Sequence, residues 1–212
     1  ALSDGYVELA GPSVTDEVST IGTLMRQHEP ECLFIIDGAL SRRSQAGSCV
    51  SEAVILCVSA ETSANPETLA EKSSFALSLL QTPALPEEIA LVFAEAMVVH
   101  PKKRVYILNG NNSDMTLAIL DTPTLVGNGK AIANKINADT SYLFLQGALT
   151  DQVLQELLSE SYFANLTVVV EDGTRLFIKP ASLQKLRDRS VELAVMNPLD
   201  VRLVCLNPTR SN

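Results

Sequence analysis

Short, uninterrupted apolar runs constrain the fold of this chain more than any other feature. The clearest run is Cys32 to Ile36, which stops at Asp37 and Gly38, and a second is Ala53 to Val58. Strands covered by helices on both faces have this composition, because neither side of the strand meets water. We therefore expect an α/β fold with a mostly parallel, helix-covered sheet.

Strand-like runs alternate with segments of helical periodicity along the rest of the chain. Residues 14–27 and 66–80 have helical spacing, and Asn65 is placed to cap the second helix. Residues 86–97 fit either a helix or an apolar strand. Further strands are expected at 104–108, 117–120, 142–145, 166–170, 174–178, 192–195 and 201–206, and further helices at 130–136, 151–159 and 181–189.

The pattern divides the chain into two portions. Residues 1–100 have a βαβ pattern and contain the Asp37 loop, whereas residues 101–212 form a mixed α+β part or a second subdomain. Within the second portion, Asp172-Gly173 separates two strand-like runs and predicts a hairpin turn.

Composition excludes several classes of partner. The chain has 212 residues, of which 46% are hydrophobic and 19% charged, enough to bury a substantial core. Its 25 acidic and 16 basic residues give a net charge of -9, which opposes attraction to nucleic acid and to anionic lipid. No apolar run approaches the roughly 20 residues that span a bilayer. We expect no nucleic-acid or membrane partner, and a cytoplasmic location.

Cysteine and histidine positions give little support for a zinc site. Three cysteines lie inside apolar runs and the fourth lies in a polar loop: Cys32, Cys57, Cys205 and Cys49. The first three are expected to be buried as small hydrophobic side chains. No C-x-x-C pair occurs, and His28 and His100 lie far apart. A metal, if one is bound, is therefore expected to have oxygen ligands.

The loop after the first apolar run contains the strongest candidate site. Asp37 falls at the expected carboxyl end of a parallel strand, where α/β proteins bind ligands and P-loop NTPases place the acid that holds magnesium. Arg42 and Arg43 have guanidinium groups suited to phosphate, and Ser41 and Ser44 add hydroxyls. The alternative is a structural aspartate at a turn followed by a solvated arginine pair.

A second candidate site precedes the first helix. Gly11 and Ser13 flank a turn that would leave backbone N–H groups free at the positive end of the helix dipole, where anions bind. The alternative is an ordinary capped helix. No G-x-x-x-x-G-K-[ST] or G-x-S-x-G sequence occurs, so neither a phosphate loop nor a catalytic residue is predicted in this chain.

One short pattern occurs twice. Phe34 to Ser41 and Leu143 to Thr150 each have three apolar residues, one polar residue, Gly-Ala-Leu and a hydroxyl. Each copy predicts a strand, a glycine turn and a hydroxyl cap. Gln146 occupies the place of Asp37, so the turn itself does not require a carboxylate.

Three segments resemble the P-loop-containing subunit of the lysine 5,6-aminomutase reactivase family: Ser3 to Ser13, Ile35 to Ser44, and Asn207-Pro208. The resemblance implies a phosphate loop upstream of these segments, binding of ATP and Mg²⁺, and a partner ATPase subunit. It also implies a role in maintaining an adenosylcobalamin-dependent aminomutase. Because this chain lacks the P-loop region, ATP hydrolysis is expected only if that region is joined to it.

Three functional hypotheses follow. The first is the C-terminal part of an accessory ATP-binding protein, with Asp37 as the magnesium-linked carboxylate and Arg42 and Arg43 as phosphate or partner contacts. The second is a non-catalytic interaction module whose acidic exterior selects a basic partner. The third is a small-molecule-binding domain that uses the helix terminus at Gly11. The oligomeric state is not indicated.

Overall fold

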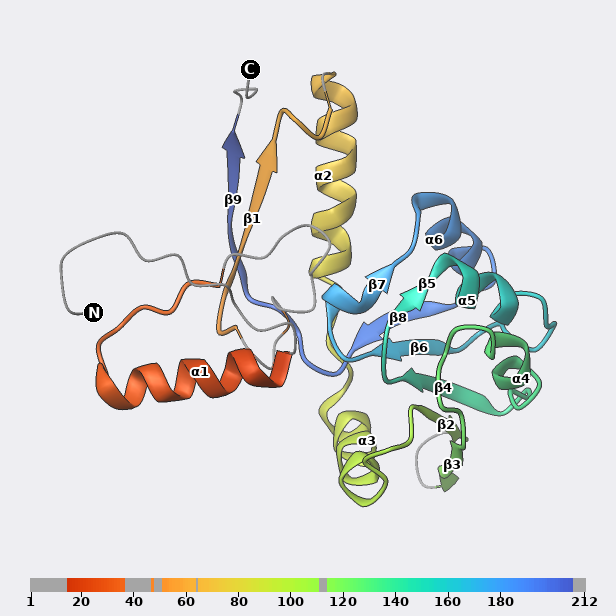
Figure 1. The fold of residues 1–212 in the computed structure, drawn as a ribbon. Helices are drawn as coiled ribbons and strands as arrows, with labels where there is room; N and C mark the ends of the chain where they lie inside the picture. Colours follow the sequence, from red (N-terminus) through yellow and green to blue (C-terminus); the bar gives the residue numbers. More distant parts are fainter. Residues whose placement is uncertain (1–14, 37–46, 48–50, 64, 111–113, 208–212) are drawn as a thin grey trace.

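The computed structural model describes residues 15–36, 47, 51–63, 65–110 and 114–207, which fold as a mixed α/β protein (Figure 1). The elements in chain order are α1 (Thr15–His28), β1 (Val54–Ser59), α2 (Pro66–Leu80), α3 (Glu87–Val99), β2 (Val105–Asn109), β3 (Thr116–Leu120), α4 (Gly129–Ala133), β4 (Thr140–Leu145), β5 (Leu149–Thr150), α5 (Asp151–Leu157), β6 (Thr167–Val170), the 3-10 helix η3 (Gly173–Arg175), β7 (Leu176–Phe177), α6 (Pro180–Arg187), β8 (Glu192–Val195) and β9 (Val201–Asn207).

A five-stranded sheet in the order β3-β2-β4-β6-β8 forms the centre of the protein. Strands β4, β6 and β8 run parallel, whereas β2 is antiparallel to both β3 and β4. In the parallel half, Phe144 is the register partner of Val169, which in turn pairs with Ala194. The expected parallel arrangement is therefore found in this half, and the other edge is antiparallel.

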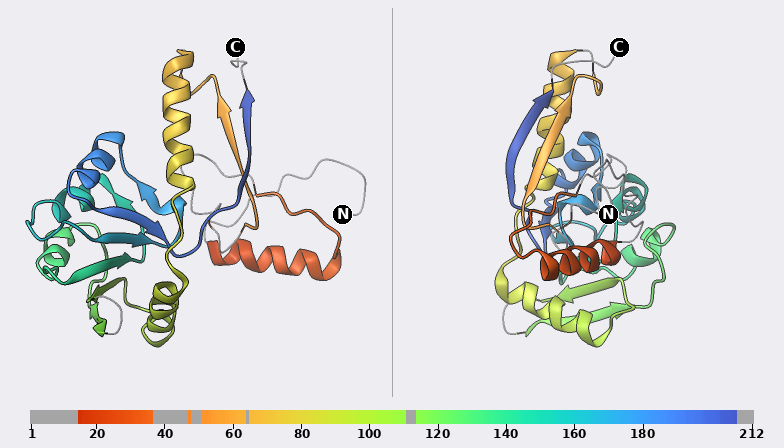
Figure 2. Two further views of the ribbon diagram at one scale, coloured as in Figure 1. Left: turned by 180° about the vertical axis from the view of Figure 1, so that it is seen from behind. Right: turned by 60° about the vertical axis from the view of Figure 1, so that its left-hand side comes forward.

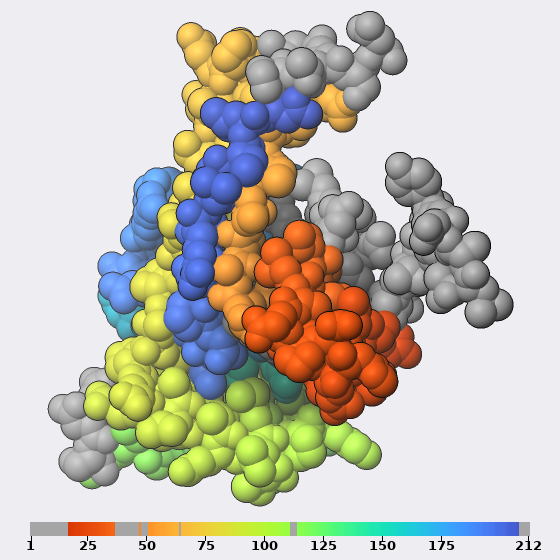
Figure 3. Space-filling model, turned by 90° about the vertical axis from the view of Figure 1, so that its left-hand side faces the viewer, coloured from red at the N-terminus to blue at the C-terminus, as the bar shows by residue number. Residues whose placement is uncertain are grey.

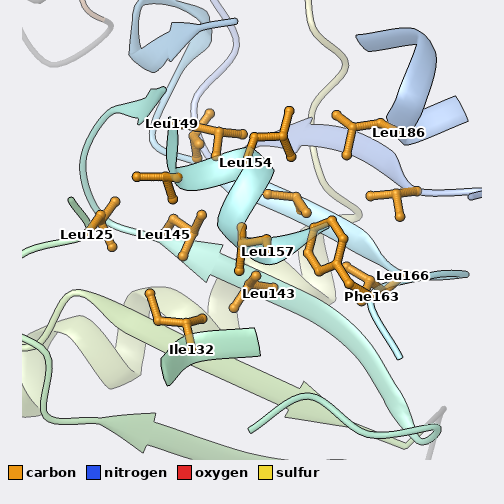
Figure 4. Packing of buried hydrophobic residues seen from close by; sticks show 14 of the residues in the cluster. Leu125, Ile132, Leu143, Leu145, Leu149, Leu154, Leu157, Phe163, Leu166 and Leu186 are labelled. Carbon is orange, nitrogen blue, oxygen red and sulfur yellow. The ribbon is translucent and has the colours of Figure 1, made fainter. Parts of the chain in front are cut away.

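Helices cover both faces of this sheet. Because side chains alternate along a strand, Leu143 and Leu145 of β4 point to one face and Phe144 to the other. The first face packs against α4, α5 and α6 (Figure 4), through residues that include Ile132, Leu154, Leu157 and Leu186. On the second face the Phe144 ring lies 5.3 Å from that of Phe93 in α3 and 5.6 Å from that of Tyr106, centroid to centroid.

The alternatives left open for residues 86–97 resolve as the helix α3. Ile89, Phe93 and Ala96 recur at helical spacing and are buried against the sheet. An apolar strand in this position would have left alternate side chains on the open side, whereas the helix buries one apolar stripe.

A second, separate sheet lies beside this domain. Strands β1 and β9 pair in parallel and form a two-stranded sheet, called here the ribbon. Helix α2 runs along one face of the ribbon, as two orientations of the molecule show (Figures 1 and 2). The ribbon therefore joins β1, in the first third of the chain, to β9, at the end of the described residues.

The predicted hairpin at Asp172-Gly173 is wrong. Gly173 begins η3, and β7 pairs in parallel with β5 rather than with β6. The Asp172 carboxylate accepts hydrogen bonds from the N–H and the hydroxyl of Thr174, which closes a tight turn locally. A Cβ at Gly173 would run into the carbonyl of Leu79 at the end of α2, so close packing rather than a hairpin requires this glycine.

The run Cys32 to Ile36, predicted as a strand, joins no ladder among the described residues. Leu33 is 83% exposed and Ile35 is 77% exposed. Although its composition is typical of a strand, this run therefore belongs to no sheet within the described part of the chain.

None of the helices described is both long enough and apolar enough to cross a lipid bilayer.

Candidate functional site

The residues predicted to bind a ligand all lie outside the part of the chain that the structure describes: Asp37, Ser41, Arg42, Arg43, Ser44, Gly11 and Ser13. Their positions relative to one another therefore stay predictions. The described part ends at Ile36 on one side of the Asp37 loop, and α1 begins two residues after Ser13.

The most unusual surface in the described residues is the ribbon. Its register places Ile55 beside Leu203 and Cys57 beside Cys205, and partners in a ladder point to the same face. Ile55 is 58% exposed and Leu203 is 52% exposed, and both cysteines are exposed. The face of the ribbon that carries these four side chains is called here the outer face, and it is apolar and open to solvent.

The opposite face is covered unevenly. Val54 and Val58 of β1 are buried on this face, whereas Leu206, the partner of Val58, is 74% exposed. On this face β1 is therefore better covered than β9. Figure 3, which looks at the molecule from the side of the ribbon, shows β9 in blue and β1 in orange side by side at the surface.

Helix α1 has exposed apolar side chains of its own. Val18 and Gly22 are buried, and a Cβ at Gly22 would meet the ring of Phe34 at 3.3 Å, so this part of the helix lies against the run Cys32 to Ile36. Ile21 and Met25 recur at helical spacing on the same side but stay exposed. Helix α1 thus has an apolar stripe that the described residues cover only in part.

A polar cluster occupies the carboxyl end of β6, where parallel sheets usually bind ligands. The Nε atom of Arg175 lies 2.9 Å from Oε2 of Glu171 as an ion pair, and Arg104, at the start of β2, donates from Nη1 to the carbonyl of Gln146 over 3.5 Å. Burial raises the pKa of Glu171, an effect that the charge of Arg175 partly offsets.

Most polar groups of this cluster are engaged with one another, although the buried Nε atom of Arg175 meets Glu171 only as an ion pair, without hydrogen-bond geometry. Asp172 is buried and caps η3, and Arg175 of η3 pairs with Glu171. Because η3 packs against the end of α2 at Gly173, these contacts hold α2 to the central domain. The geometry therefore indicates a structural joint rather than a ligand site.

A shallow hollow of about 550 Å³ lies at the opposite edge, where β4, β6 and β8 begin. Its lining includes the carboxylates of Asp139 and Glu192 together with Ser141 and Thr167, and it has no cationic side chain. Negative charge without a cation disfavours phosphate. The hollow is open and has no converging set of ligands, so it does not define a site.

The repeated Gly-Ala-Leu pattern is confirmed where its second copy lies. Leu143 to Leu145 end β4, Gly147 has a φ of 144°, and the hydroxyl oxygen of Thr150 accepts from the N–H of Val153 at the start of α5. Gln146 lies at the carboxyl end of the strand, the place that Asp37 would occupy in the first copy. The first copy itself runs out of the described residues after Ile36.

The expectation of buried thiols is wrong for two of the three cysteines described. Cys57 and Cys205 are exposed, and Cys32 is half-buried. Their apolar neighbours indicate a covered strand, but the described residues leave the outer face of the ribbon open. Sequence inspection missed the Cys57 and Cys205 pair because the two residues lie far apart in the chain and only the strand register brings them together.

Within the described residues, no group of three or more histidine, cysteine, aspartate or glutamate side chains is arranged to hold a metal ion. The residues predicted to contact Mg²⁺ and ATP lie outside these residues.

Comparison with known proteins gives no match: neither a protein family, nor a curated protein, nor a solved structure is significantly similar to this chain.

Proposed function

We propose that this chain is a non-catalytic α/β interaction module, and that a partner protein completes its ribbon. The observation that supports the proposal is a parallel pair of apolar strands whose outer face is open. Among the described residues, β1 and β9 form a strand ladder only with each other.

The exposed outer face is unusual because β1 and β9 run parallel. Antiparallel sheets commonly have one solvated face, whereas parallel sheets occur with both faces covered, and two strands alone are only marginally stable in water. The chemistry of the ribbon therefore fits a partner that adds an apolar strand and covers the outer face with helices. Such a partner is itself an α/β polypeptide, and it binds by extending the sheet.

Helix α1 and the run Cys32 to Ile36 extend the proposed docking surface. Ile21 and Met25 of α1, together with Leu33 and Ile35, expose large apolar side chains near the start of the described chain. Large exposed apolar side chains that gather on a surface are typical of interaction sites. The net charge of -9 favours a partner with a basic rim around its apolar contact.

Hydrogen exchange of the isolated chain tests this proposal without knowledge of the partner. At a concentration where light scattering gives a monomer, we expect amides of β1 and β9 to exchange about 100-fold or more faster than those of β4 and β6, because a bare ribbon opens locally. Equal protection of the two strand pairs would mean that the ribbon needs no partner, and would reject the proposal.

The accessory ATP-binding function is a second candidate, and the ribbon favours it in one respect. The sheet of a P-loop domain is parallel and covered by helices. Such a sheet would supply neighbouring strands for the ribbon and for the run Cys32 to Ile36, and its helices would bury their exposed side chains. In this proposal the P-loop polypeptide is the partner, and the whole assembly serves an adenosylcobalamin-dependent aminomutase.

Nucleotide titration tests the second candidate. The complete encoded polypeptide would be titrated with ATP in the presence and absence of Mg²⁺, as wild type, Asp37→Ala and Asp121→Ala. Asp121, which is exposed and paired with Lys103, is the matched control. We expect Asp37→Ala alone to lose the magnesium-dependent part of the affinity. Unchanged affinity in Asp37→Ala would reject the assignment of that residue and leave the docking proposal untouched.

A further inference from the structure

Two cysteines lie side by side on the outer face of the ribbon. Cys57 of β1 is the register partner of Cys205 of β9, and neither forms a disulfide. Both thiols are exposed, and register partners in a parallel ladder point to the same face. The fold therefore creates a pair of neighbouring thiols from two distant parts of the sequence.

Strand spacing determines what such a pair can bind. Neighbouring strands lie about 4.8 Å apart, and parallel side chains that point the same way keep about that separation at their Cβ atoms. A relaxed disulfide needs Cβ atoms about 3.8 Å apart. This typical spacing is wider than an unstrained disulfide prefers, whereas thiols at this spacing can turn so that their sulfurs lie on either side of one bridging atom.

A two-coordinate soft cation matches this distance. With a metal–sulfur bond of about 2.3 Å, the length found for zinc thiolates, a cation in line between two sulfurs holds them about 4.6 Å apart. Zinc itself takes four ligands in structural sites. The described residues contain no third histidine, cysteine, aspartate or glutamate converging on the pair, which disfavours zinc.

We propose that Cys57 and Cys205 bind one monovalent soft cation, Cu(I), between their sulfur atoms. Thiolates select Cu(I) over harder ions. On binding, two S–Cu bonds form, each thiol releases its proton to solvent, and no oxidation state changes. Ile55 and Leu203 flank the pair on one side, and Ser59 and Asn207 on the other, so no carboxylate of either strand adjoins it on this face.

The metal site is independent of the docking proposal, because it needs only the register of β1 and β9. A partner that covers the outer face would also cover the two thiols. Cu(I) and the partner are therefore expected to compete, since two ligands that exclude each other weaken each other's binding equally.

Anaerobic titration of the reduced chain with Cu(I), in competition with the chelator bicinchoninate, tests the site. We expect one Cu(I) per chain, and a loss of affinity of about 10-fold or more in both Cys57→Ser and Cys205→Ser, because either change removes one of two ligands. The matched controls are Cys32→Ser, at a half-buried position, and Cys49→Ser, which are expected to bind as wild type.

Several outcomes would overturn the proposal. One is equal affinity in the wild type and either ribbon variant, and another is a loss that follows Cys32→Ser or Cys49→Ser instead. A third is a copper-bridged dimer in native mass spectrometry, which would place the two sulfurs on different chains. Circular dichroism of each variant checks that the fold is retained, so a loss of affinity reports the missing ligand.

Discussion

Two pairs of parallel strands in this protein have similar apolar composition and opposite surroundings. In the central sheet, β4 and β6 are covered on both faces, and the side chains from Leu143 to Leu145 and from Val168 to Val170 are at most 1% exposed. In the ribbon, Ile55 and Leu203 are more than half exposed. An apolar run therefore specifies a strand that must be covered, without specifying which polypeptide provides the cover.

The difference arises from chain connectivity. Strands β4, β6 and β8 follow one another with α5 and α6 between them, so each crossover brings a helix onto the sheet. The ribbon pairs β1, in the first third of the chain, with β9 at the end of the described residues. Local connections complete the central domain, whereas among the described residues only α2 follows directly from a strand of the ribbon.

Truncation of one leucine in each region gives the largest expected contrast. Leu145→Ala removes a fully buried side chain from β4 and should cost about 2–5 kcal/mol of unfolding free energy, through lost burial and a cavity. Leu203→Ala removes a half-exposed side chain and should cost less than about 1 kcal/mol. Urea denaturation followed by circular dichroism measures both.

The same pair of variants can disprove the comparison. If Leu203→Ala costs as much as Leu145→Ala in the monomeric chain, Leu203 is packed in solution and the outer face of the ribbon is not open. If the cost of Leu203→Ala appears only at high protein concentration, the ribbon is covered by a second copy of the chain.

Gly173→Ala tests the joint between the two regions. The added Cβ would meet the carbonyl of Leu79 and the Cα of Leu80, and because these are backbone atoms, α2 must shift at a cost of about 2–3 kcal/mol. Gly127→Ala is the control: Gly127 has a φ of 77° but no atom near the new Cβ, so it reports backbone strain alone, about 1 kcal/mol.

Comparison of the two variants shows whether α2 is held in place by the central domain or moves with the ribbon. Thermal unfolding of both variants should give the lower midpoint for Gly173→Ala, because Leu79 belongs to the core of the central domain. A midpoint equal to that of Gly127→Ala would show that α2 moves away freely, and that it belongs to the ribbon rather than to the domain.

The stability of the central domain can also be tested through its pH dependence, at Asp151. Burial acts to raise its pKa, but hydrogen bonds from the Ser182 hydroxyl (2.6 Å) and the Lys179 N–H (3.0 Å), with the Lys179 charge, hold the pKa below its usual value. Asp151→Asn should cost about 1–2 kcal/mol at pH 7. Asp188→Asn, an exposed residue near the end of α6, is the control and should cost less than about 0.5 kcal/mol.

The sign of the pH effect follows from the lowered pKa. The carboxylate stabilises the fold above its unfolded-state pKa of about 3.9, and this contribution is lost as pH falls through the lower folded-state value. The difference in unfolding free energy between wild type and Asp151→Asn should therefore shrink below about pH 4. A difference that stays constant from pH 7 to pH 3 would show that the lost charge is not responsible.

Local signals made much of the fold predictable from sequence. Helical spacing and the Asn65-Pro66 start predicted α2 to the residue, and the strand, glycine and threonine between Leu143 and Thr150 predicted the turn into α5. These features are decided by residues close together in the chain, since caps and turns use neighbouring backbone groups.

Features that depend on distant residues were not predictable. The predicted hairpin at Asp172-Gly173 was wrong because glycine is required there by the close contact with the backbone of Leu79, which is far away in sequence. The exposure of Cys57 and Cys205 follows from a strand pairing that no local pattern encodes. The residues of the predicted nucleotide site, from Asp37 to Ser44, stay a prediction because they lie outside the described chain.

The smallest expected effect comes from removing one helix cap beside the ribbon and one in the central domain, and comparing the loss of stability. The Asn65 side chain accepts hydrogen bonds from the N–H groups of Glu67 (2.8 Å) and Thr68 (3.2 Å) at the ribbon end of α2, and the Thr150 hydroxyl accepts from Val153 (3.3 Å) in the closed domain. Each alanine substitution removes about 1 kcal/mol of capping free energy. In Thr150→Ala we expect the whole loss in global stability, because α5 unfolds only with the core.

In Asn65→Ala we expect the loss to appear locally instead. The first turns of α2 lie along an uncovered ribbon, so they can fray while Leu79 at the other end stays in the core. Amide exchange within residues 66–72 should therefore accelerate about fivefold, the equivalent of about 1 kcal/mol, while the urea midpoint changes less than in Thr150→Ala. Equal shifts of the midpoint in the two variants would show that α2 and the ribbon unfold together with the central domain, and that the open region is not an independent unit of stability.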